Sequence, residues 1–417
     1  FRERVALLKG LDESVMQEIA ENLPITEGVD RLMRILKKVG FKIAILSGGF
    51  SYFGNYLKQK YDVDRIWSYS RISTYVSEPW AYRMTYLDPA KVRTSNVYSI
   101  IGAWLHDVIQ DYQEGKTNRD EMYEAFQDTI MKWRLEYHGY KFLNEKVENG
   151  YINNLDDYFK NTAKIPYEVE NEKPVYVTFK DNDGNNIVFI GYLDSIYTDS
   201  DGFFHILDYK TSSKGDYIGK KLKAHSKQLQ LYAIGIHQLR GIPYDKIKLE
   251  FDMMKYYKVA YLQKNGKWKD SIQERSIWVM SQEKKIRALL QENGMDVFEI
   301  DELVAQANFD NNLDGLPDYV QERFELKNCF IETEINEEIE KEITDFVVAS
   351  VTECVEKEKG DWDVEFPEPI IDDGNRFYFE QLAPELLKYH KGYQETVKVN
   401  RANKTDLAIS ELDALFL

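Results

Sequence analysis

Two aspartates and a lysine lie close together in a stretch that is typical of a β-hairpin. If the turn falls on Ser200–Gly202, Asp194 lies directly opposite Asp208 on the neighbouring strand. Directly opposed residues have Cβ atoms roughly 5 Å apart, so two carboxylates there repel each other unless a cation lies between them. Because side chains alternate along a strand, Lys210 projects to the same face as Asp208, while Tyr209 points to the other face. Two carboxylates and one ammonium group are therefore expected to converge.

This trio suits metal-assisted hydrolysis. Carboxylate oxygens are preferred ligands of hard divalent ions such as Mg²⁺ and Mn²⁺. A lysine beside such an ion can stabilise the charge on an attacking or transferring oxygen. A surface hairpin with an ordinary salt bridge explains the same three residues, so both interpretations stay open at this point.

Hydrophobic periodicity predicts the elements that would position the trio. Apolar residues at helical spacing predict helices over 96–113 and 227–240. Strand-type runs, of which the first three are joined by Asp- and Gly-containing hairpin turns, occupy residues 173–180, 186–198, 203–211 and 246–262. This mixture predicts an α/β fold with a mixed central sheet flanked by helices.

The order of these motifs resembles that of the PD-(D/E)XK nuclease superfamily, in particular its RecB-like exonuclease branch. That branch has the pattern G-x-x-D, then D-Y-K-T, then Q-x-x-x-Y, which is matched here by Gly191, Asp194, Asp208, Lys210, Gln228 and Tyr232. An upstream helix of the branch supplies a metal-binding histidine, matched here by His106. The resemblance covers about residues 66–260 and implies a restriction-endonuclease-like core.

The resemblance also implies an activity, which is Mg²⁺- or Mn²⁺-dependent hydrolysis of phosphodiester bonds in DNA. The metal ligands that it implies are His106, Asp194, Asp208 and the backbone carbonyl of Tyr209. Lys210 would position the attacking water and stabilise the transition state. Gln228 and Tyr232, which share one helical face, would contact Lys210 or a DNA phosphate. A histidine ligand suits manganese somewhat better than magnesium.

The cysteine content departs from one feature of this branch. Several RecB-like nucleases, including CRISPR-associated and AddB-type ones, hold a 4Fe–4S cluster with four cysteines. Here Glu78 replaces the first of them, although Pro79 and Tyr82 fit the surrounding pattern. Only Cys329 and Cys354 are present in the chain, which is too few for an all-cysteine cluster. We therefore expect no iron–sulfur cluster. Side-chain packing would have to stabilise this region of the fold in its place.

The first 64 residues have a different character. Their stretch "ILSGGF", which contains Ser47, resembles the second motif of phosphoserine phosphatases of the haloacid dehalogenase superfamily. The DxDxT nucleophile motif and the GDGxND motif of that family are missing from the sequence. We expect residues 1–64 to be a catalytically inert segment and interpret it as an engineered fusion partner.

Charge and hydropathy restrict the partners. The net charge of −17 argues against general attraction to nucleic acid, so DNA binding would need a local basic patch such as the lysine-rich stretch 210–227. No run approaches the roughly 18 apolar residues of a membrane span, and the N-terminal residues lack a signal-peptide pattern. The expected location is the cytoplasm, without a membrane partner.

These observations predict three regions in the chain and leave more than one candidate function. After residues 1–64 we expect a nuclease core over 65–276 and a mainly helical, acidic region over 277–417. The favoured function is a DNA exonuclease acting on single strands or DNA ends in phage or mobile-element recombination, repair or processing. The alternative is a DNA-binding or recruitment module with a vestigial metal site, docking a sliding clamp through the acidic and hydrophobic tail Glu411–Leu417. A phosphatase is the third candidate.

Overall fold

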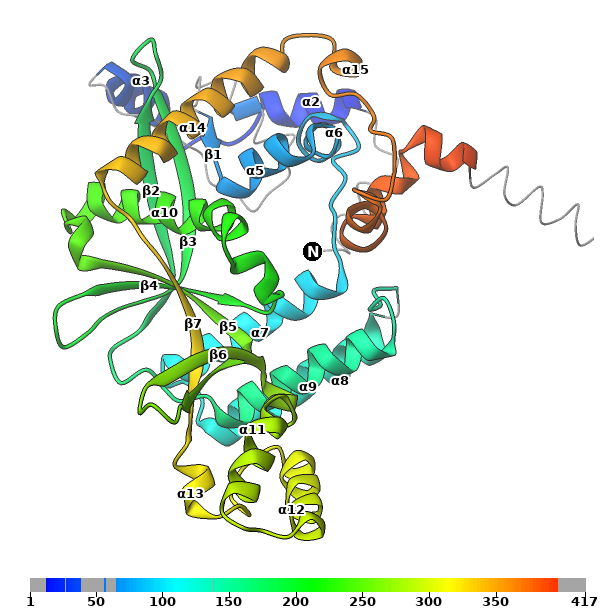
Figure 1. The fold of residues 1–417 in the computed structure, drawn as a ribbon. Helices are drawn as coiled ribbons and strands as arrows, with labels where there is room; N and C mark the ends of the chain where they lie inside the picture. The colour runs from blue at the N-terminus through cyan, green and yellow to red at the C-terminus, as the bar shows by residue number, and fades with distance from the viewer. Residues whose placement is uncertain (1–12, 27, 39–55, 58–64, 138, 397–417) are drawn as a thin grey trace, which may run out of the picture.

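The fold is built around a seven-stranded mixed β-sheet (Figure 1). The computed structural model describes residues 13–26, 28–38, 56–57, 65–137 and 139–396. The strands are β1 (Ile66–Trp67), β2 (Glu170–Lys180), β3 (Asn186–Thr198), β4 (Phe204–Lys210), β5 (Ile247–Leu262), β6 (Trp268–Glu274) and β7 (Phe324–Thr333). This architecture confirms the predicted α/β class with a mixed central sheet.

Strands β3, β4 and β5 form the middle of the sheet. Strand β3 pairs with β4 and β2 in antiparallel fashion and with β1 in parallel. Strand β4 is parallel to β5, and β5 pairs antiparallel with both β6 and β7. The central strand β4 is buried along nearly its whole length. At its C-terminal end, residues 208–210 stay paired with β5, whereas the pairing with β3 ends at Leu207.

The hairpin between β3 and β4 forms at the predicted turn. The carboxylate of Asp199 accepts hydrogen bonds from the backbone N–H groups of Asp201 and Phe203, both at 2.9 Å. Gly202 has a φ of 79°, a left-handed conformation that glycine adopts without steric strain. The resulting register pairs Ser195 with Leu207. This is the register that the sequence predicts.

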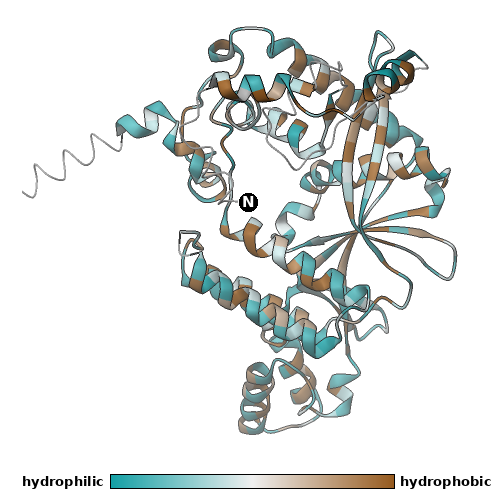
Figure 2. Ribbon diagram, turned by 180° about the vertical axis from the view of Figure 1, so that it is seen from behind, coloured by the Kyte–Doolittle hydropathy of each residue, from teal (hydrophilic) through white to brown (hydrophobic). Residues whose placement is uncertain are grey.

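Three helices cover one face of the sheet. They are α7 (Val97–Gln113), α8 (Arg119–Glu136) and α9 (Glu145–Asn161). Their apolar side chains form a cluster with Leu207, Tyr209 and Met254 of the sheet. Hydrophilic residues dominate the outer surface of the α8 and α9 pair (Figure 2). The amphipathic pattern that predicts the first of these helices is thus explained by burial of its apolar face.

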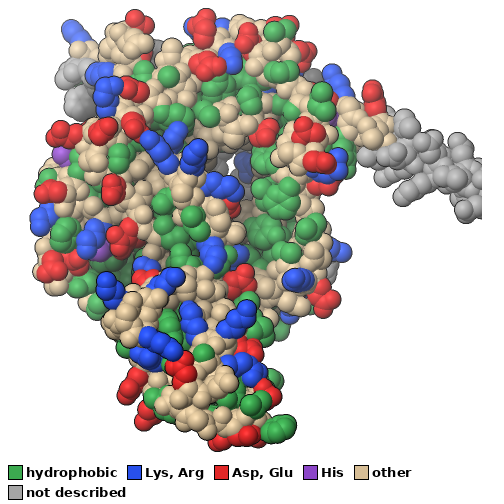
Figure 3. Space-filling view, in the orientation of Figure 1, with side chains coloured by type: hydrophobic (Ala, Val, Ile, Leu, Met, Phe, Trp, Pro, Cys, Tyr) green, Lys and Arg blue, Asp and Glu red, His purple; other side chains and the backbone are tan. Residues whose placement is uncertain are grey.

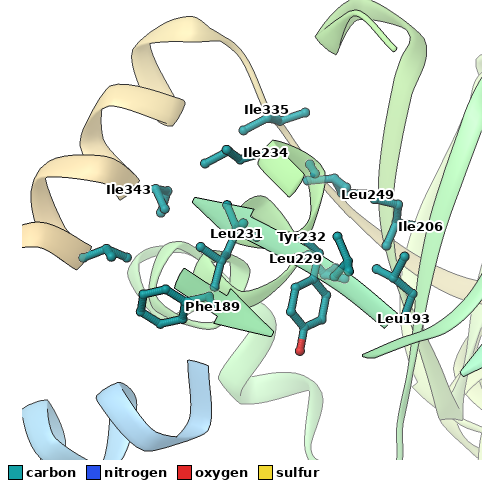
Figure 4. Close-up of a cluster of buried hydrophobic side chains, with 14 of the residues drawn as sticks. Phe189, Leu193, Ile206, Leu229, Leu231, Tyr232, Ile234, Leu249, Ile335 and Ile343 are labelled. Atoms are coloured by element: carbon teal, nitrogen blue, oxygen red, sulfur yellow. The ribbon is translucent and has the colours of Figure 1, made fainter. Parts of the chain in front are cut away.

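The opposite face is covered by helices from distant parts of the sequence. They are α5 (Tyr69–Ser77), α10 (Lys220–Arg240) and α14 (Glu337–Lys357). Figure 4 shows part of their shared cluster, in which Leu231 and Ile234 of α10 lie beside Ile343 of α14 and Leu249 of β5. Side chains of this cluster are buried, which ties the start of the predicted nuclease core and residues that follow the core to the same sheet.

The region after residue 277 is mainly helical, as expected, but it also returns a strand to the sheet. Helices α11 (Trp278–Glu292), α12 (Val297–Asp310) and α13 (Asp318–Gln321) precede β7. The sequence analysis overlooked β7, because its outward-facing positions are charged and only Phe324 and Cys329 are buried. The domain boundary between 276 and 277 stays a prediction.

Several contacts connect the segment before α7 with the C-terminal part of the chain. The guanidinium of Arg65 forms an ion pair with Glu358 at 2.6 Å, and the Tyr82 hydroxyl donates to the same carboxylate at 2.5 Å. Further along, Trp80 of α6 (Pro79–Tyr82) packs against Phe379, with ring centroids 6.0 Å apart.

Cys329 and Cys354 are both buried free thiols, and they lie on β7 and α14.

Parts of the predicted terminal segments lie outside the described residues. The N-terminal region contributes α2 (Glu13–Glu21) and α3 (Val29–Lys38). The "ILSGGF" stretch with Ser47, and the tail Glu411–Leu417, lie outside the residues that the structure describes. Among the helices in the described ranges, none combines the length and the apolar character needed to cross a membrane.

Candidate active site

Asp194 and Asp208 meet where the ladder between β3 and β4 ends. The last hydrogen-bonded pair is Ser195 with Leu207, and the next position along each strand carries one of the two aspartates. The backbone N–H of Tyr209 donates to the Asp194 carboxylate at 3.2 Å, which draws that carboxylate across the gap. The two acids are therefore neighbours, as the hairpin register predicts.

Burial makes the Asp194 carboxylate difficult to ionise. Its side chain is 19% exposed. Loss of hydration raises the pKa of Asp194 well above its usual value, and repulsion from Asp208 raises it further. Negative charge is thus concentrated at a point where little water can screen it. A bound cation would relieve this repulsion directly.

Lys210 is the cation that the chain itself supplies. Its Nζ lies 2.6 Å from Oδ1 of Asp208, so the two side chains lie on the same side of β4, as expected. Burial is the largest effect and opposes its positive charge, but the attractions of Asp208, Tyr217 and Asp194 together outweigh burial, and the pKa of Lys210 is raised. Lys210 therefore remains an ammonium group at neutral pH, next to the paired carboxylates.

His106 reaches the same place from helix α7. The helix begins at a capping box in which Asn96 and Ser99 exchange side-chain and backbone hydrogen bonds. One face of α7 is buried against the sheet, and this orients Nδ1 of His106 to 3.4 Å from Oδ2 of Asp194. Burial lowers the pKa of His106, so the imidazole is neutral at neutral pH and retains a lone pair that can bind a metal.

Gln228 and Tyr232 complete the predicted set from helix α10. Nε2 of Gln228 donates to the Tyr232 hydroxyl at 2.9 Å, which confirms that they share one helical face. A Cβ atom on Gly191 would lie 2.1 Å from Cε1 of Tyr232, so only glycine fits beneath that ring. Figure 4 shows the Tyr232 hydroxyl directed out of the hydrophobic cluster. Gln228 borders the same cavity as Lys210.

The sequence analysis missed a buried amide behind these residues. Nε2 of Gln110 donates to the backbone carbonyl of Asp194 at 3.0 Å and to Oε1 of Glu172 at 3.1 Å. The backbone carbonyl of Gln110 accepts a hydrogen bond of 3.1 Å from Nδ2 of Asn171. Gln110 lies one helical turn after His106, and that spacing is the one signal in the sequence that points to it. The hydrogen bonds of Gln110 therefore join α7 to both β2 and β3.

Strand β2 is distorted at the same place. Glu172 has a φ of 49°, which is unusual for a residue other than glycine. The pairing between β2 and β3 passes from Asn171 with Ser195 to Lys173 with Leu193, and Glu172 is skipped. The hydroxyl groups of Ser195 and Tyr209 share a hydrogen bond of 3.2 Å. A continuous polar network therefore links α7, β2, β3 and β4 beneath the paired aspartates.

Replacing Gln110 with alanine is expected to weaken the apparent affinity for Mn²⁺ about 10- to 100-fold, the range typical of residues that orient metal ligands. The physical reason is that α7 loses its hydrogen bond to Asp194, so His106 is no longer held in place. Gln113→Ala is the matched control, because Gln113 is an equally buried glutamine of α7 that contacts Ala163 and Ile165 instead. Titration calorimetry with Mn²⁺ measures the difference. Equal losses in both variants would show that Gln110 only stabilises the fold.

The donor types fit a divalent metal, although the side chains do not form a preformed cage. Across the residues that the structure describes, no group of three His, Cys, Asp or Glu side chains surrounds a common metal position. Asp208 instead faces Lys210. What fits is the combination of two carboxylates in mutual repulsion with a neutral imidazole, a set that suits Mg²⁺ or Mn²⁺. The role of the Tyr209 carbonyl as a ligand stays a prediction.

The fold and the four converging side chains are those of a metal-dependent nuclease core. The family model of the PD-(D/E)XK nuclease superfamily matches residues 66–324 of the chain. This match covers more than half of the sequence, so the chain belongs to the PD-(D/E)XK nuclease superfamily. The family resemblance inferred from the motifs is thereby confirmed.

The N-terminal region has separate relatives. The phosphoserine phosphatases of Archaeoglobus fulgidus and Haemophilus influenzae are each 48% identical over 64 residues, and that of Saccharomyces cerevisiae is 42% identical over 65 residues. Each match covers 15% of this chain, and 19%, 20% and 21% of the respective relatives. The chain thus spans about a fifth of the length of these curated relatives.

Proposed function

We propose that this chain is a divalent-metal-dependent deoxyribonuclease of the RecB-like branch, acting as an exonuclease on single strands or DNA ends. The observation that carries the proposal is the convergence of Asp194, Asp208, Lys210 and His106 at the end of the β3–β4 hairpin. An ordinary surface salt bridge does not explain it, because Asp194 is desolvated and repelled by a second carboxylate.

Each residue has a separate part in the proposed hydrolysis. A bound Mg²⁺ or Mn²⁺ would supply an activated water and polarise the phosphoryl oxygens. Asp194, Asp208 and His106 provide the ligand atoms, and Gln110 orients α7. Lys210, held as an ammonium beside Asp208, positions the nucleophile and stabilises the negative charge that develops in the transition state. Gln228 and Tyr232 border the site and support the position of Lys210 or of a phosphate.

The proposed DNA path uses the lysines at the start of helix α10. Lys221 pairs with Asp216 at 3.0 Å and Lys223 pairs with Glu342 at 2.7 Å, whereas Lys227 lies over the ring of Phe346. Lys221 and Lys223 are exposed enough to exchange their partners for a phosphate, and Lys227 is half-buried beside them. Because the chain carries a net charge of −17, such local cations must act against the overall field.

Several finer expectations remain proposals. They include the inert character of residues 1–64, the division of the chain at 276, the cytoplasmic location, and a role in phage or mobile-element DNA processing. The sliding-clamp tail Glu411–Leu417 also stays a prediction, since it lies outside the described residues. A recruitment module with a vestigial metal site is the alternative that the experiment below separates from a nuclease.

The test uses the complete chain with end-labelled single-stranded and duplex DNA, in chelator, in Mg²⁺ and in Mn²⁺. We expect no cleavage in chelator, cleavage in either metal, and a rate in Mn²⁺ at least equal to that in Mg²⁺ because one ligand is a histidine. Labels on either end report the direction of digestion. DNA binding without cleavage in both metals would favour the recruitment module, and release of phosphate from phosphoserine would contradict the inert N-terminal segment.

A further inference from the structure

A cavity of about 290 Å³ opens directly beside Lys210. One wall comes from helix α5, with Tyr69 and Ser73, and the other from helix α10, with His225 and Gln228. Phe346 of α14 closes the far side. The cavity is therefore assembled from three helices that are distant in sequence, and it shares Lys210 and Gln228 with the candidate active site.

Among the residues that the structure describes, no carboxylate lines this cavity, although the chain contains 71 acidic residues. Four other cavities formed by described residues each include at least two acidic side chains. The cations on its lining are Lys210 and Lys227. On the face shown in Figure 3, Lys and Arg side chains likewise gather around the central hollow, and many Asp and Glu side chains lie towards the outer edge. The cavity is thus suited to a negatively charged ligand.

Aromatic rings provide flat surfaces inside it. The exposed ring of His225 stacks on Tyr217, with centroids 5.0 Å apart and an interplanar angle of 28°. Tyr217 is itself braced by Phe251, whose ring lies 4.8 Å away, edge to face. Burial lowers the pKa of His225, so this imidazole is an uncharged aromatic surface at neutral pH. The Tyr69 hydroxyl donates to the backbone carbonyl of Ala224, which holds its ring across the cavity.

We propose that this cavity binds one unpaired nucleotide next to the scissile phosphate, with its base between Tyr69 and the stacked rings of His225 and Tyr217. Lys227 would contact the phosphate on the far side of that nucleotide. This inference rests on the proposed nuclease function and specifies its substrate. A base within a duplex is already stacked on its neighbours and cannot also stack on these rings, so the strand must be single or frayed at this point.

The experiment measures DNA binding in chelator, so that cleavage plays no part. A fluorescent oligothymidylate is compared with versions in which one nucleotide at a time, from either end, is abasic. We expect His225→Ala and Tyr69→Ala to weaken binding roughly 5- to 150-fold, the effect of losing one base–aromatic stack. His225→Phe and Tyr69→Phe, which keep a ring, should restore most of the affinity. Tyr192→Ala is the matched control, because Tyr192 is an exposed tyrosine of β3 outside the cavity.

One abasic position should be decisive. Removing that base should weaken binding by the wild-type protein but have no further effect on His225→Ala or Tyr69→Ala, because the stacking surface is already lost. The proposal would be overturned if both alanine variants bound DNA with wild-type affinity. It would also be overturned if every abasic position weakened binding equally in the wild-type protein and in the variants. Circular dichroism confirms that the variants fold. If the binding pattern is as expected but the protein never cleaves DNA, the nucleotide-binding proposal stands and the nuclease function is refuted. If the protein cleaves DNA but does not show this binding pattern, the nuclease function stands and the nucleotide-binding proposal is refuted.

Discussion

Lys210→Ala is expected to lower the rate of DNA cleavage at saturating metal by about 100- to 1,000-fold, which is typical for loss of one transition-state donor. The ammonium group lies 2.6 Å from Asp208 and is not a metal ligand in the proposed arrangement. Metal binding should therefore persist, and it should strengthen because Asp208 loses a competing cation. Cleavage kinetics combined with Mn²⁺ calorimetry measures both quantities in the same preparation.

Two further variants sharpen this result. Lys180→Ala is the control, since Lys180 is an exposed lysine at the end of β2, outside the candidate site and outside the proposed DNA path. Lys210→Arg should restore little activity, because a planar guanidinium does not reproduce the compact charge of an ammonium. Cleavage by Lys210→Ala at close to the wild-type rate would rule out the nuclease assignment.

Asp194→Asn is expected to abolish cleavage and yet to stabilise the metal-free fold at neutral pH. In the wild-type protein, burial and repulsion from Asp208 raise the pKa of Asp194. The folded state therefore binds a proton more readily than the unfolded state, and stability falls as the pH rises from about 4 through the raised pKa. Each unit of that shift destabilises the neutral-pH fold by about 1.4 kcal/mol. Asparagine keeps an acceptor for the Tyr209 N–H without carrying the charge.

Urea unfolding in chelator, at mildly acidic and at neutral pH, measures this effect. The stabilisation should be large at neutral pH and should vanish below the unfolded-state pKa, where Asp194 is protonated in both states. In saturating Mn²⁺ the order should reverse, because the wild-type carboxylate gains a cation and asparagine does not. Asp201→Asn, in the exposed hairpin turn, is the control and should change neither quantity. A metal-free Asp194→Asn protein that is less stable than wild type at neutral pH would contradict the account.

Much of the catalytic hairpin was predictable because its information is local. A turn of defined length and the two-residue period of strands determine which side chains meet, and the structure pairs Ser195 with Leu207 accordingly. The same reasoning placed Gln228 and Tyr232 on one face of a helix, where they share a hydrogen bond. Local periodicity could not, however, reveal that Gly191 is required by the ring of Tyr232.

The third strand partner of β5 was not predictable in this way. Strand β7 buries only Phe324 and Cys329 among exposed and half-buried residues, and its acidic surroundings are typical of a surface helix. Its pairing with β5 depends on bringing together segments that are far apart in the chain, with α11, α12 and α13 between them. Local sequence patterns do not indicate which pairs of segments come together when such a long loop closes.

The sequence by itself determined the chemistry that is available and the register of its central hairpin. It specified two carboxylates and a lysine at the ends of paired strands, a histidine on an amphipathic helix, and a lysine-rich segment in an acidic chain. These follow from residue type and from the fixed periods of strand and helix. Tertiary structure decided how those groups behave. Packing of α7 against the sheet brought His106 to Asp194 and removed water from both, which is what shifts their pKa values. Packing of α5 and α14 beside α10 formed the carboxylate-free cavity next to Lys210. Desolvation and concavity arise only when distant segments are buried together, so no local pattern contains them.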